Sequence, residues 1–397
     1  MGKLKVLLLT LILVLFIMPS YLAAETGVTD KEVVIGVIEP LTGPAAGWGV
    51  PIAAGIQGWA DYINENGGIH GRKIKIIAKD DGYNPARSVA GLQEMKNDIF
   101  AVVGQLGSAP CAAAKDFYPE NKIPLVTAYG NVMIYAKQPK EKQKYYFQAY
   151  PNYEDETEYM TGYAINTLGV KTIAHFYQND EYGLGANAGI KTALKKNPGK
   201  AKLIAEIPYE VGERSLGTHA IKLKESGAEL VIMTAMLSSG AIMTKEMAKI
   251  AYRPKVMGNF PLGNDLMFKI AGPTWEGTYS FVSAHQGIPG FHPEADKIFD
   301  LVSKRRPKAK GNAVTALFGA ASMMHMEKGL QNAGKDLTRE SLIKGMEKIK
   351  NWTCPAGGAP ITYGPDRHHG TNSVWPVVAK DGKHRPIGNY IEFKPKY

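Results

Sequence analysis

The fold of this chain is indicated first by residues 33–38, which read VVIGVI. A near-continuous apolar run of this length is typical of a strand buried on both faces of a parallel sheet. A loop rich in Gly and Pro follows at residues 40–49, and apolar residues then recur at helical spacing from Ile52 to Ile63. Residues 73–79 alternate as a second strand, so the chain opens with a strand, a helix and a strand.

The same alternation continues along most of the chain. It predicts right-handed βαβ crossovers and therefore parallel sheets. Further strands are expected near residues 100–104, 124–127, 171–177, 203–208 and 229–234, with helices near 86–98, 109–121, 155–168, 184–196, 215–226 and 239–251.

Eight or so strands could instead close into a barrel, but two features favour open sheets. Residues 138–153 form a polar and aromatic passage without βα rhythm, as expected where a chain crosses between lobes. The C-terminal third then departs from the alternation. It predicts helices near 293–304, 313–332 and 338–349 and strands near 361–363 and 374–379.

Composition bounds the class of protein. The chain has 397 residues, 45% of them hydrophobic and 21% charged, which suggests two or three globular domains and excludes disorder as the main state. Two cysteines are too few for a disulfide scaffold and lack the paired spacing of a zinc module. The formal charge of +10 raises nucleic acid as a partner.

The first 24 residues weaken that idea, because they resemble a secretory signal peptide. Lys3 and Lys5 precede an apolar run at residues 6–18 that is too short to span a bilayer, and small residues end at Ala24. We expect cleavage after Ala24, with an uncleaved anchor as the alternative. Loss of the two lysines lowers the charge to +8, and an exported protein meets no nucleic acid, so none is expected as a partner.

Four local patterns occur in a fixed order along the chain. Together they resemble the leucine/isoleucine/valine-type periplasmic solute-binding proteins, the type I periplasmic binding proteins of ABC importers. The order and spacing match along most of residues 30–280 and more loosely beyond. The patterns are Ile35-Gly36-Val37 leading into Pro40-Leu41-Thr42-Gly43-Pro44 and Trp48-Gly49; Ile63-Asn64 with Gly67-Gly68-Ile69 and Gly71, running into Asp80-Asp81; Val102-Val103-Gly104 followed by Ser108; and Tyr182-Gly183 after a strand.

The resemblance implies an α/β fold of two Rossmann-like lobes with open parallel sheets, joined by three crossovers, with the ligand between them. Crossovers are expected near 148, 283 and 356. After the signal peptide of residues 1–24, lobe one then comprises residues 25–148 and 284–355, and lobe two residues 149–283 and 356–397. The same resemblance implies a periplasmic monomer without a cofactor, whose partners are a small carboxylate and the permease subunits of an ABC importer.

The family often carries a disulfide in lobe one that this chain lacks. Its two cysteines would fall near Gly82-Tyr83-Asn84 and at Gly107, so both are missing together. Cys111 and Cys354 then form either a long-range bridge or two separate thiols. A bridge needs their Cα atoms within about 7 Å.

Candidate ligand residues in lobe one begin with Ser108. In the sequence Gly107-Ser108-Ala109-Pro110 it is an N-cap candidate, and the free N–H groups of a first turn suit a carboxylate. The alternative is that Ser108 only caps its own helix. The resemblance also implies ligand contacts from Tyr129, Gly130 and Asn131, although a lone Asn is equally typical of a turn.

Two aromatic residues are expected to cover the ligand. Trp48 lies in a glycine-flanked loop, where it is poorly placed for the core. Tyr182 matches the aromatic residue of lobe two that closes over the ligand in the family. Packing is the alternative role for both.

The main departure from the family concerns the ligand's ammonium group. Phe260 stands about where amino-acid binders carry an acid, and Ala235-Met236 replace an expected tyrosine. Burying an ammonium without a partner costs several kcal/mol, whereas phenyl and thioether groups favour an apolar body. Three acids could compensate for the missing one, although each is more often a surface or hinge residue; they are Glu39 first, then Asp265 and Asp180.

The motifs of common enzymes are missing. The sequence holds no G-x-S-x-G elbow, HExxH, P-loop or EF-hand loop, and Asp366 with His368-His369 lacks a fourth ligand at recognisable spacing, so no metal site is expected. The sequence predicts a non-enzymatic binder of a branched-chain or other hydrophobic amino acid. The alternatives are an amine-free aromatic or aliphatic acid in the same site, an extracellular ligand sensor, and, last, a secreted hydrolase.

Overall fold

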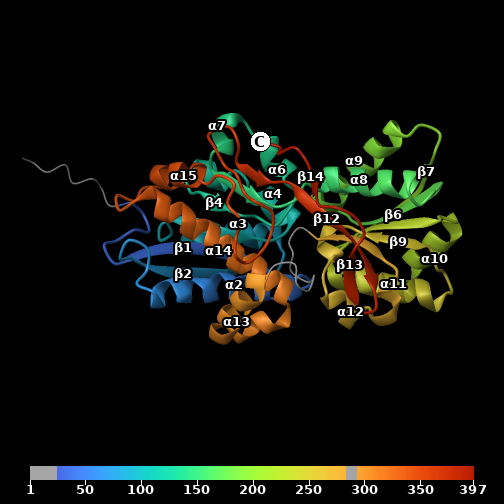
Figure 1. Ribbon diagram of the computed structural model, residues 1–397, viewed down its shortest axis with the longest axis horizontal. Coiled ribbons are helices and arrows are strands. Elements are labelled where there is room, and N and C mark those ends of the chain that lie inside the picture. The colour runs from blue at the N-terminus through green and yellow to red at the C-terminus, as the bar shows by residue number, and fades with distance from the viewer. Residues whose placement is uncertain (1–24, 283–292) are drawn as a thin grey trace, which may run out of the picture.

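A computed structural model describes residues 25–282 and 293–397. The expected signal peptide of residues 1–24 lies outside the described residues. Two α/β lobes lie side by side along the longest axis of the molecule (Figure 1), and each is built on its own sheet. Within the described part of the chain, no helix is both long and apolar enough to cross a membrane.

Lobe one contains a six-stranded sheet in the order β11-β5-β4-β3-β1-β2. All of its strand pairs are parallel. The first part of the chain supplies β1 (Glu32–Glu39), α2 (Ala46–Glu65), β2 (Lys73–Asp80), α3 (Pro85–Met95), β3 (Ala101–Gln105), α4 (Ser108–Ala114), α5 (Phe117–Glu120), β4 (Leu125–Val126), α6 (Met133–Ala136), α7 (Lys140–Gln143) and β5 (Tyr146–Ala149).

The chain returns to lobe one after residue 292. This part adds helices and the edge strand next to β5. Its elements are α13 (Pro293–Arg305), the 3-10 helix η3 (Pro307–Gly311), α14 (Ala313–Ala333), α15 (Arg339–Glu347) and β11 (His369–Thr371).

Lobe two contains the larger sheet, in the order β13-β12-β10-β9-β8-β6-β7, with β14 paired to β12. Its core is parallel, and β12 and β13 add antiparallel strands at one edge. The elements are α8 (Tyr153–Asn166), β6 (Thr172–Gln178), α9 (Glu181–Lys196), β7 (Lys202–Tyr209), α10 (Gly217–Ser226), β8 (Leu230–Thr234), α11 (Leu237–Lys249), β9 (Lys255–Gly258), the 3-10 helix η1 (Phe260–Leu262), α12 (Leu266–Ile270), the 3-10 helix η2 (Gly272–Trp275), β10 (Tyr279–Val282), β12 (Ser373–Lys380), β13 (Lys383–Pro386) and β14 (Ile391–Glu392).

The chain passes between the two sheets three times. The first sheet is left after β5, which ends at Ala149, and the second sheet after β10, which ends at Val282; the passage expected near 283 falls outside the described residues. The third passage lies between β11 and β12, at Asn372, and not near 356. The first and third passages are hydrogen-bonded, because the side-chain oxygen of Asn372 accepts from the backbone N–H of Asn152 at 2.8 Å.

Helices α2 and α14 pack closely in lobe one because glycines lie at their contact. A Cβ added to Gly55 of α2 would lie 2.0 Å from the Ala316 oxygen, and one added to Gly319 of α14 would lie 2.1 Å from the Ile52 oxygen. The small residues therefore let the two backbones approach, which fixes α14 against the helix that begins at the cleft.

Some expected elements differ from the structure. The helix expected over 109–121 is two short helices, α4 and α5. Residues 361–363 form no strand, since Ile361 makes only an isolated bridge with Trp352. The short strand of this region is β11 instead. It forms by pairing with β5, and its sequence alone does not mark it as a strand.

Candidate functional site

Both sheets direct the carboxyl ends of their central strands toward the space between the lobes. In each sheet the strand order reverses beside the first strand, between β1 and β3 in lobe one and between β6 and β8 in lobe two. Loops diverge at such a point and leave a crevice, which is where open α/β sheets bind ligands.

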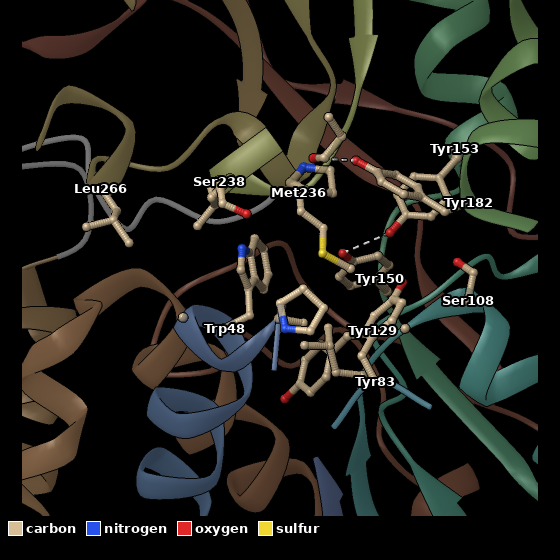
Figure 2. Close-up of a pocket in the computed structure, with 18 of the residues that line it drawn as sticks. Trp48, Tyr83, Ser108, Tyr129, Tyr150, Tyr153, Tyr182, Met236, Ser238 and Leu266 are labelled. Carbon is tan, nitrogen blue, oxygen red and sulfur yellow. Dashed lines mark hydrogen bonds between the residues drawn. The ribbon is translucent and has the colours of Figure 1, made fainter. Parts of the chain in front are cut away.

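A cavity of about 190 Å³ occupies this crevice. An engineered cavity of ~150 Å³ admits benzene, so the volume suits a small organic molecule. We call it the cleft pocket, and part of its lining is shown in Figure 2. It is lined by Pro44, Ala45, Gly47, Trp48, Tyr83, Leu106, Gly107, Ser108, Tyr129, Tyr150, Tyr153, Tyr182, Ala235, Met236, Leu237, Ser238, Pro261, Leu266 and Ile270.

Five of the nine predicted ligand residues line this pocket: Trp48, Ser108, Tyr129, Tyr182 and Met236. The other four are Gly130, Asn131, Phe260 and Glu39, which are buried or lie behind the lining.

Trp48 lies in the first turn of α2, not in a loop as expected. The helix starts at Ala46 without a side-chain cap, so the sequence carries no capping residue to mark its beginning. Trp48 is buried and stacks on Phe318 of α14, with ring centroids 6.3 Å apart. One face of the pocket is therefore held by the α2–α14 pair.

Ser108 is the first helical residue of α4 rather than its N-cap. Gly107 is the cap and has φ of 108°, a backbone conformation that favours glycine. The Ser108 hydroxyl oxygen accepts from the backbone N–H of Asn131 at 2.9 Å. A hydroxyl also has one proton to donate, and among the described residues no acceptor for the Ser108 proton is found, so it is available to a ligand.

Tyr129, Gly130 and Asn131 follow β4, but only Tyr129 lines the pocket. The Tyr129 hydroxyl bonds with α14, at the Phe318 oxygen (3.1 Å) and the Ser322 hydroxyl. Gly130 lies against Ser108, because a Cβ added to Gly130 would be 3.2 Å from the Ser108 Cα. The Asn131 side chain donates to the Glu181 oxygen of lobe two at 2.8 Å, so it joins the lobes.

A cluster of three tyrosines forms the wall between the lobes. The Tyr153 hydroxyl donates to the Tyr150 hydroxyl at 3.1 Å, and the Tyr153 and Tyr182 rings are 4.7 Å apart. Tyr182 bonds with the Asn259 side-chain oxygen (2.7 Å) and the Ala235 oxygen (3.3 Å); its bond to Ala235 is drawn in Figure 2. Because the Tyr150 oxygen accepts and is not found to donate within the described chain, its proton is also available.

Phe260 does not reach the pocket. It is 3% exposed and packs edge-to-face on Tyr150 (5.1 Å between centroids) and on Phe318 of lobe one (5.7 Å). Its neighbour Pro261 lines the pocket in its place. The Met236 side chain extends into the pocket from lobe two (Figure 2), where its thioether adds apolar surface.

The three candidate acids lie elsewhere. Glu39 is fully buried and does not line the pocket, and burial, with the Asp81 charge, raises its pKa well above its usual value. Asp180 is the N-cap of α9 and accepts from the Tyr182 N–H at 2.9 Å. Asp265 contacts the His384 ring nitrogen at 2.9 Å.

Tyr83 is a lining residue that the sequence did not reveal. Its backbone has φ of 64° and its N–H donates to Asp81 Oδ1 at 2.8 Å. The ring lies against Gly107, and its hydroxyl accepts from Gln178 of lobe two at 3.0 Å. Tyr83 and Gly107 therefore touch at the two places where the family often carries a disulfide that this chain lacks.

Cys111 and Cys354 are both buried, free thiols, so the alternative of two separate thiols holds. The suggested metal triad is also dispersed. Asp366 pairs with Lys140 at 2.5 Å, His368 with Glu347 at 3.1 Å, and His369 contacts the Tyr150 oxygen at 2.8 Å. No group of three potential metal ligands is found within residues 25–282 and 293–397.

The electrostatic character of the pocket follows from its lining. No Asp, Glu, Lys, Arg or His is among the lining residues within the described part of the chain. Burial raises the pKa of all five lining tyrosines above the usual value, so they stay neutral and can donate hydrogen bonds; these are Tyr83, Tyr129, Tyr150, Tyr153 and Tyr182.

Comparison with known proteins agrees with this architecture. The model of the family described as periplasmic binding protein matches residues 32–383. The Leu/Ile/Val-binding protein homolog 3 of Brucella melitensis is 25% identical over 323 residues, which cover 80% of this chain and 84% of that protein.

Solved structures share the fold. A fatty acid ABC transporter substrate-binding protein from Thermomonospora curvata superposes with a TM-score of 0.83 at 21% identity, covering 95% of this chain and 96% of that one. A branched-chain amino acid ABC transporter protein from Thermus thermophilus, with bound valine, also has a TM-score of 0.83, at 15% identity, covering 92% of this chain and 98% of that one.

Proposed function

The chain belongs to the periplasmic binding protein family, and we propose that it is the exported solute-binding component of an ABC importer, closing two lobes around a small carboxylate with an apolar body. The family consists of substrate-binding transport proteins. The observation that carries the proposal for this chain is the cleft pocket, which lies between the lobes and combines an aromatic lining with unused hydroxyl protons.

The pocket supports a ligand with one polar end. Ser108, at the beginning of α4, accepts from Asn131 and keeps its own proton for the ligand. Hydrogen bonds to a charged acceptor are stronger than bonds between neutral groups. A carboxylate at this wall, with its body against Trp48 and Met236, uses both features of the pocket.

Closure of the lobes is supported by contacts that join them beside the pocket. Asn131 donates to Glu181, and Gln178 donates to Tyr83. A ligand that touches both lobes binds the closed state better than the open state and so shifts the equilibrium toward closure. We propose that a permease in the membrane then receives the ligand from a monomeric carrier, without a cofactor and without catalysis.

The test is direct binding by the mature chain. Unfolded and refolded protein, freed of co-purified molecules, is screened against small carboxylates by thermal shift, and hits are titrated by calorimetry. One-to-one binding, together with loss of uptake of the same compound when the gene is deleted, supports the proposal. Binding without any loss of uptake indicates a sensor instead, and turnover of the bound compound indicates an enzyme.

A further inference from the structure

The cleft pocket contains no group that could neutralise a ligand's ammonium. Its described lining is aromatic, aliphatic or hydroxylic. Every Asp and Glu of the chain lies in the described residues, because residues 1–24 and 283–292 contain neither. The acids of the whole molecule can therefore be accounted for, and none of them lines this pocket.

Two buried carboxyl groups, Glu39 and Glu156, lie outside the lining of the pocket. Glu39 lies beside Gly104, where an added Cβ would be 2.9 Å from its Oε1 and 3.5 Å from the Tyr129 ring. Glu156 of α8 accepts from the backbone N–H of Phe260. Burial raises the pKa of both carboxyl groups well above the usual value, so neither is a ready counter-ion.

Asp180 and Asp265 are already committed to other partners. Asp180 accepts from the Tyr182 N–H and from the Gln178 side chain. Asp265 faces His384, which also accepts from Trp275 at 3.5 Å. Each carboxylate thus already has a hydrogen-bond partner within the protein, and neither lines the pocket.

Two hydroxyl groups of the lining are available as donors. The protons of Ser108 and Tyr150 have no acceptor among the residues that the structure describes, while both oxygens already accept. An anion satisfies such protons, whereas an ammonium would meet more donors. We propose, on the basis of the function proposed above, that the ligand is an amine-free monocarboxylic acid, and that the pocket rejects the corresponding α-amino acid.

The experiment uses two matched pairs of probes, 4-methylpentanoate with leucine and 3-phenylpropanoate with phenylalanine. Members of a pair differ only in the amine. An unpaired buried ammonium costs several kcal/mol, so the amine-free member of a pair is expected to bind about 100-fold tighter or more. Equal or tighter binding of the amino acids overturns the inference but leaves the proposed function standing.

A variant that gains an acid tests whether the lack of a carboxylate in the pocket causes the rejection of α-amino acids. Met236 lines the pocket from lobe two, and Met236→Asp supplies the missing carboxylate while Met236→Asn supplies the same shape without charge. The preference for the amine-free acid is expected to shrink or reverse in M236D and to persist in M236N. Equal preferences in the two variants overturn the inference.

A third probe tests whether the aromatic rings of the pocket bind a cation without help from an acid. Glycine betaine has a carboxylate and a quaternary ammonium, which aromatic faces can hold without an acid. Tighter binding of betaine than of both amine-free acids overturns the inference. Failure of every carboxylate tested, amine-bearing or not, overturns the proposed function itself.

Discussion

The side-chain amide of Asn131, in lobe one, donates a 2.8 Å hydrogen bond to the backbone oxygen of Glu181, in lobe two. The contact is tight, because a Cβ added to Gly185 of α9 would lie 2.4 Å from the same nitrogen. Ser108 also holds Asn131 in place, because the Ser108 hydroxyl oxygen accepts a hydrogen bond from the Asn131 backbone N–H. One residue of lobe one thus connects the pocket wall to lobe two.

Asn131→Ala is expected to weaken ligand binding about fivefold, because it removes the hydrogen bond of ~1 kcal/mol between the lobes; the bond it also loses, from the Met133 N–H, lies within lobe one. Calorimetric titration measures the effect. Asn332→Ala is the matched control, since the Asn332 side chain donates to the Gly345 oxygen at 3.0 Å within lobe one. Equal losses in both variants would show that Asn131 has no special part in closure.

Ser108→Ala is expected to weaken carboxylate binding by tenfold or more, since hydrogen bonds to charged groups contribute about 1.5–3 kcal/mol. The variant also leaves the Asn131 N–H without its acceptor. Ser303→Ala in α13 is the control, because the Ser303 hydroxyl donates to the Asp300 oxygen of its own helix. Unchanged affinity in S108A contradicts the proposed carboxylate site.

Gly107→Ala is expected to destabilise the protein and to abolish binding. The positive φ alone costs about 1–2 kcal/mol for a residue with a side chain, and the new methyl group would lie 2.4 Å from the Tyr83 ring. Gly71→Ala is the control, because Gly71 also has a positive φ (83°), but a Cβ added there would have no neighbouring atom within 4 Å. A thermal unfolding midpoint that falls equally in both variants would mean that the Tyr83 contact is unimportant.

Asp81 makes stability depend on pH. Burial raises its pKa from 3.8 to about 6, so the folded state holds this proton more tightly than the unfolded state. The stability that the protonated Asp81 contributes to the folded state is fully present below about pH 4 and is lost as the pH rises through about 6. Asp81→Asn should therefore gain stability relative to wild type between these values, as measured by urea unfolding. The exposed Asp98→Asn variant is the control, and a wild-type slope in D81N would contradict the assignment.

Processing of the N-terminus can be checked by intact mass. Export of the full-length chain is expected to release a mature protein that begins at Glu25, because small residues end at Ala24. Ala24→Leu should slow this cleavage, because signal peptidase requires a small residue at this position. A mature protein that retains residues 1–24 would contradict the prediction.

The strands of the βα units were largely predictable because their signals are local. VVIGVI at residues 33–38 lies within β1, and its apolar residues fill both faces of the sheet. β5 was missed, since the four residues YFQA lie in a polar passage and become a strand by pairing with β4 and β11. The third passage between lobes escaped for the same reason, as no change of composition marks Asn372.

The site was predictable only in part. Ser108 and Tyr182, which follow strand ends, could be placed by the strand pattern together with the family resemblance, and both line the pocket. Tyr83 could not, because its direction depends on a left-handed turn and on the space left by Gly107 far along the chain. Glu39 failed for the opposite reason. It does end β1, but its side chain turns into the core instead of the crevice.

The triple passage of the chain between its two lobes has a consequence for proteolysis. A protease that cuts one passage leaves two covalent tethers, and the bond between Asn372 and Asn152 holds the first and third passages together. A single cut in one passage therefore does not by itself separate the two lobes.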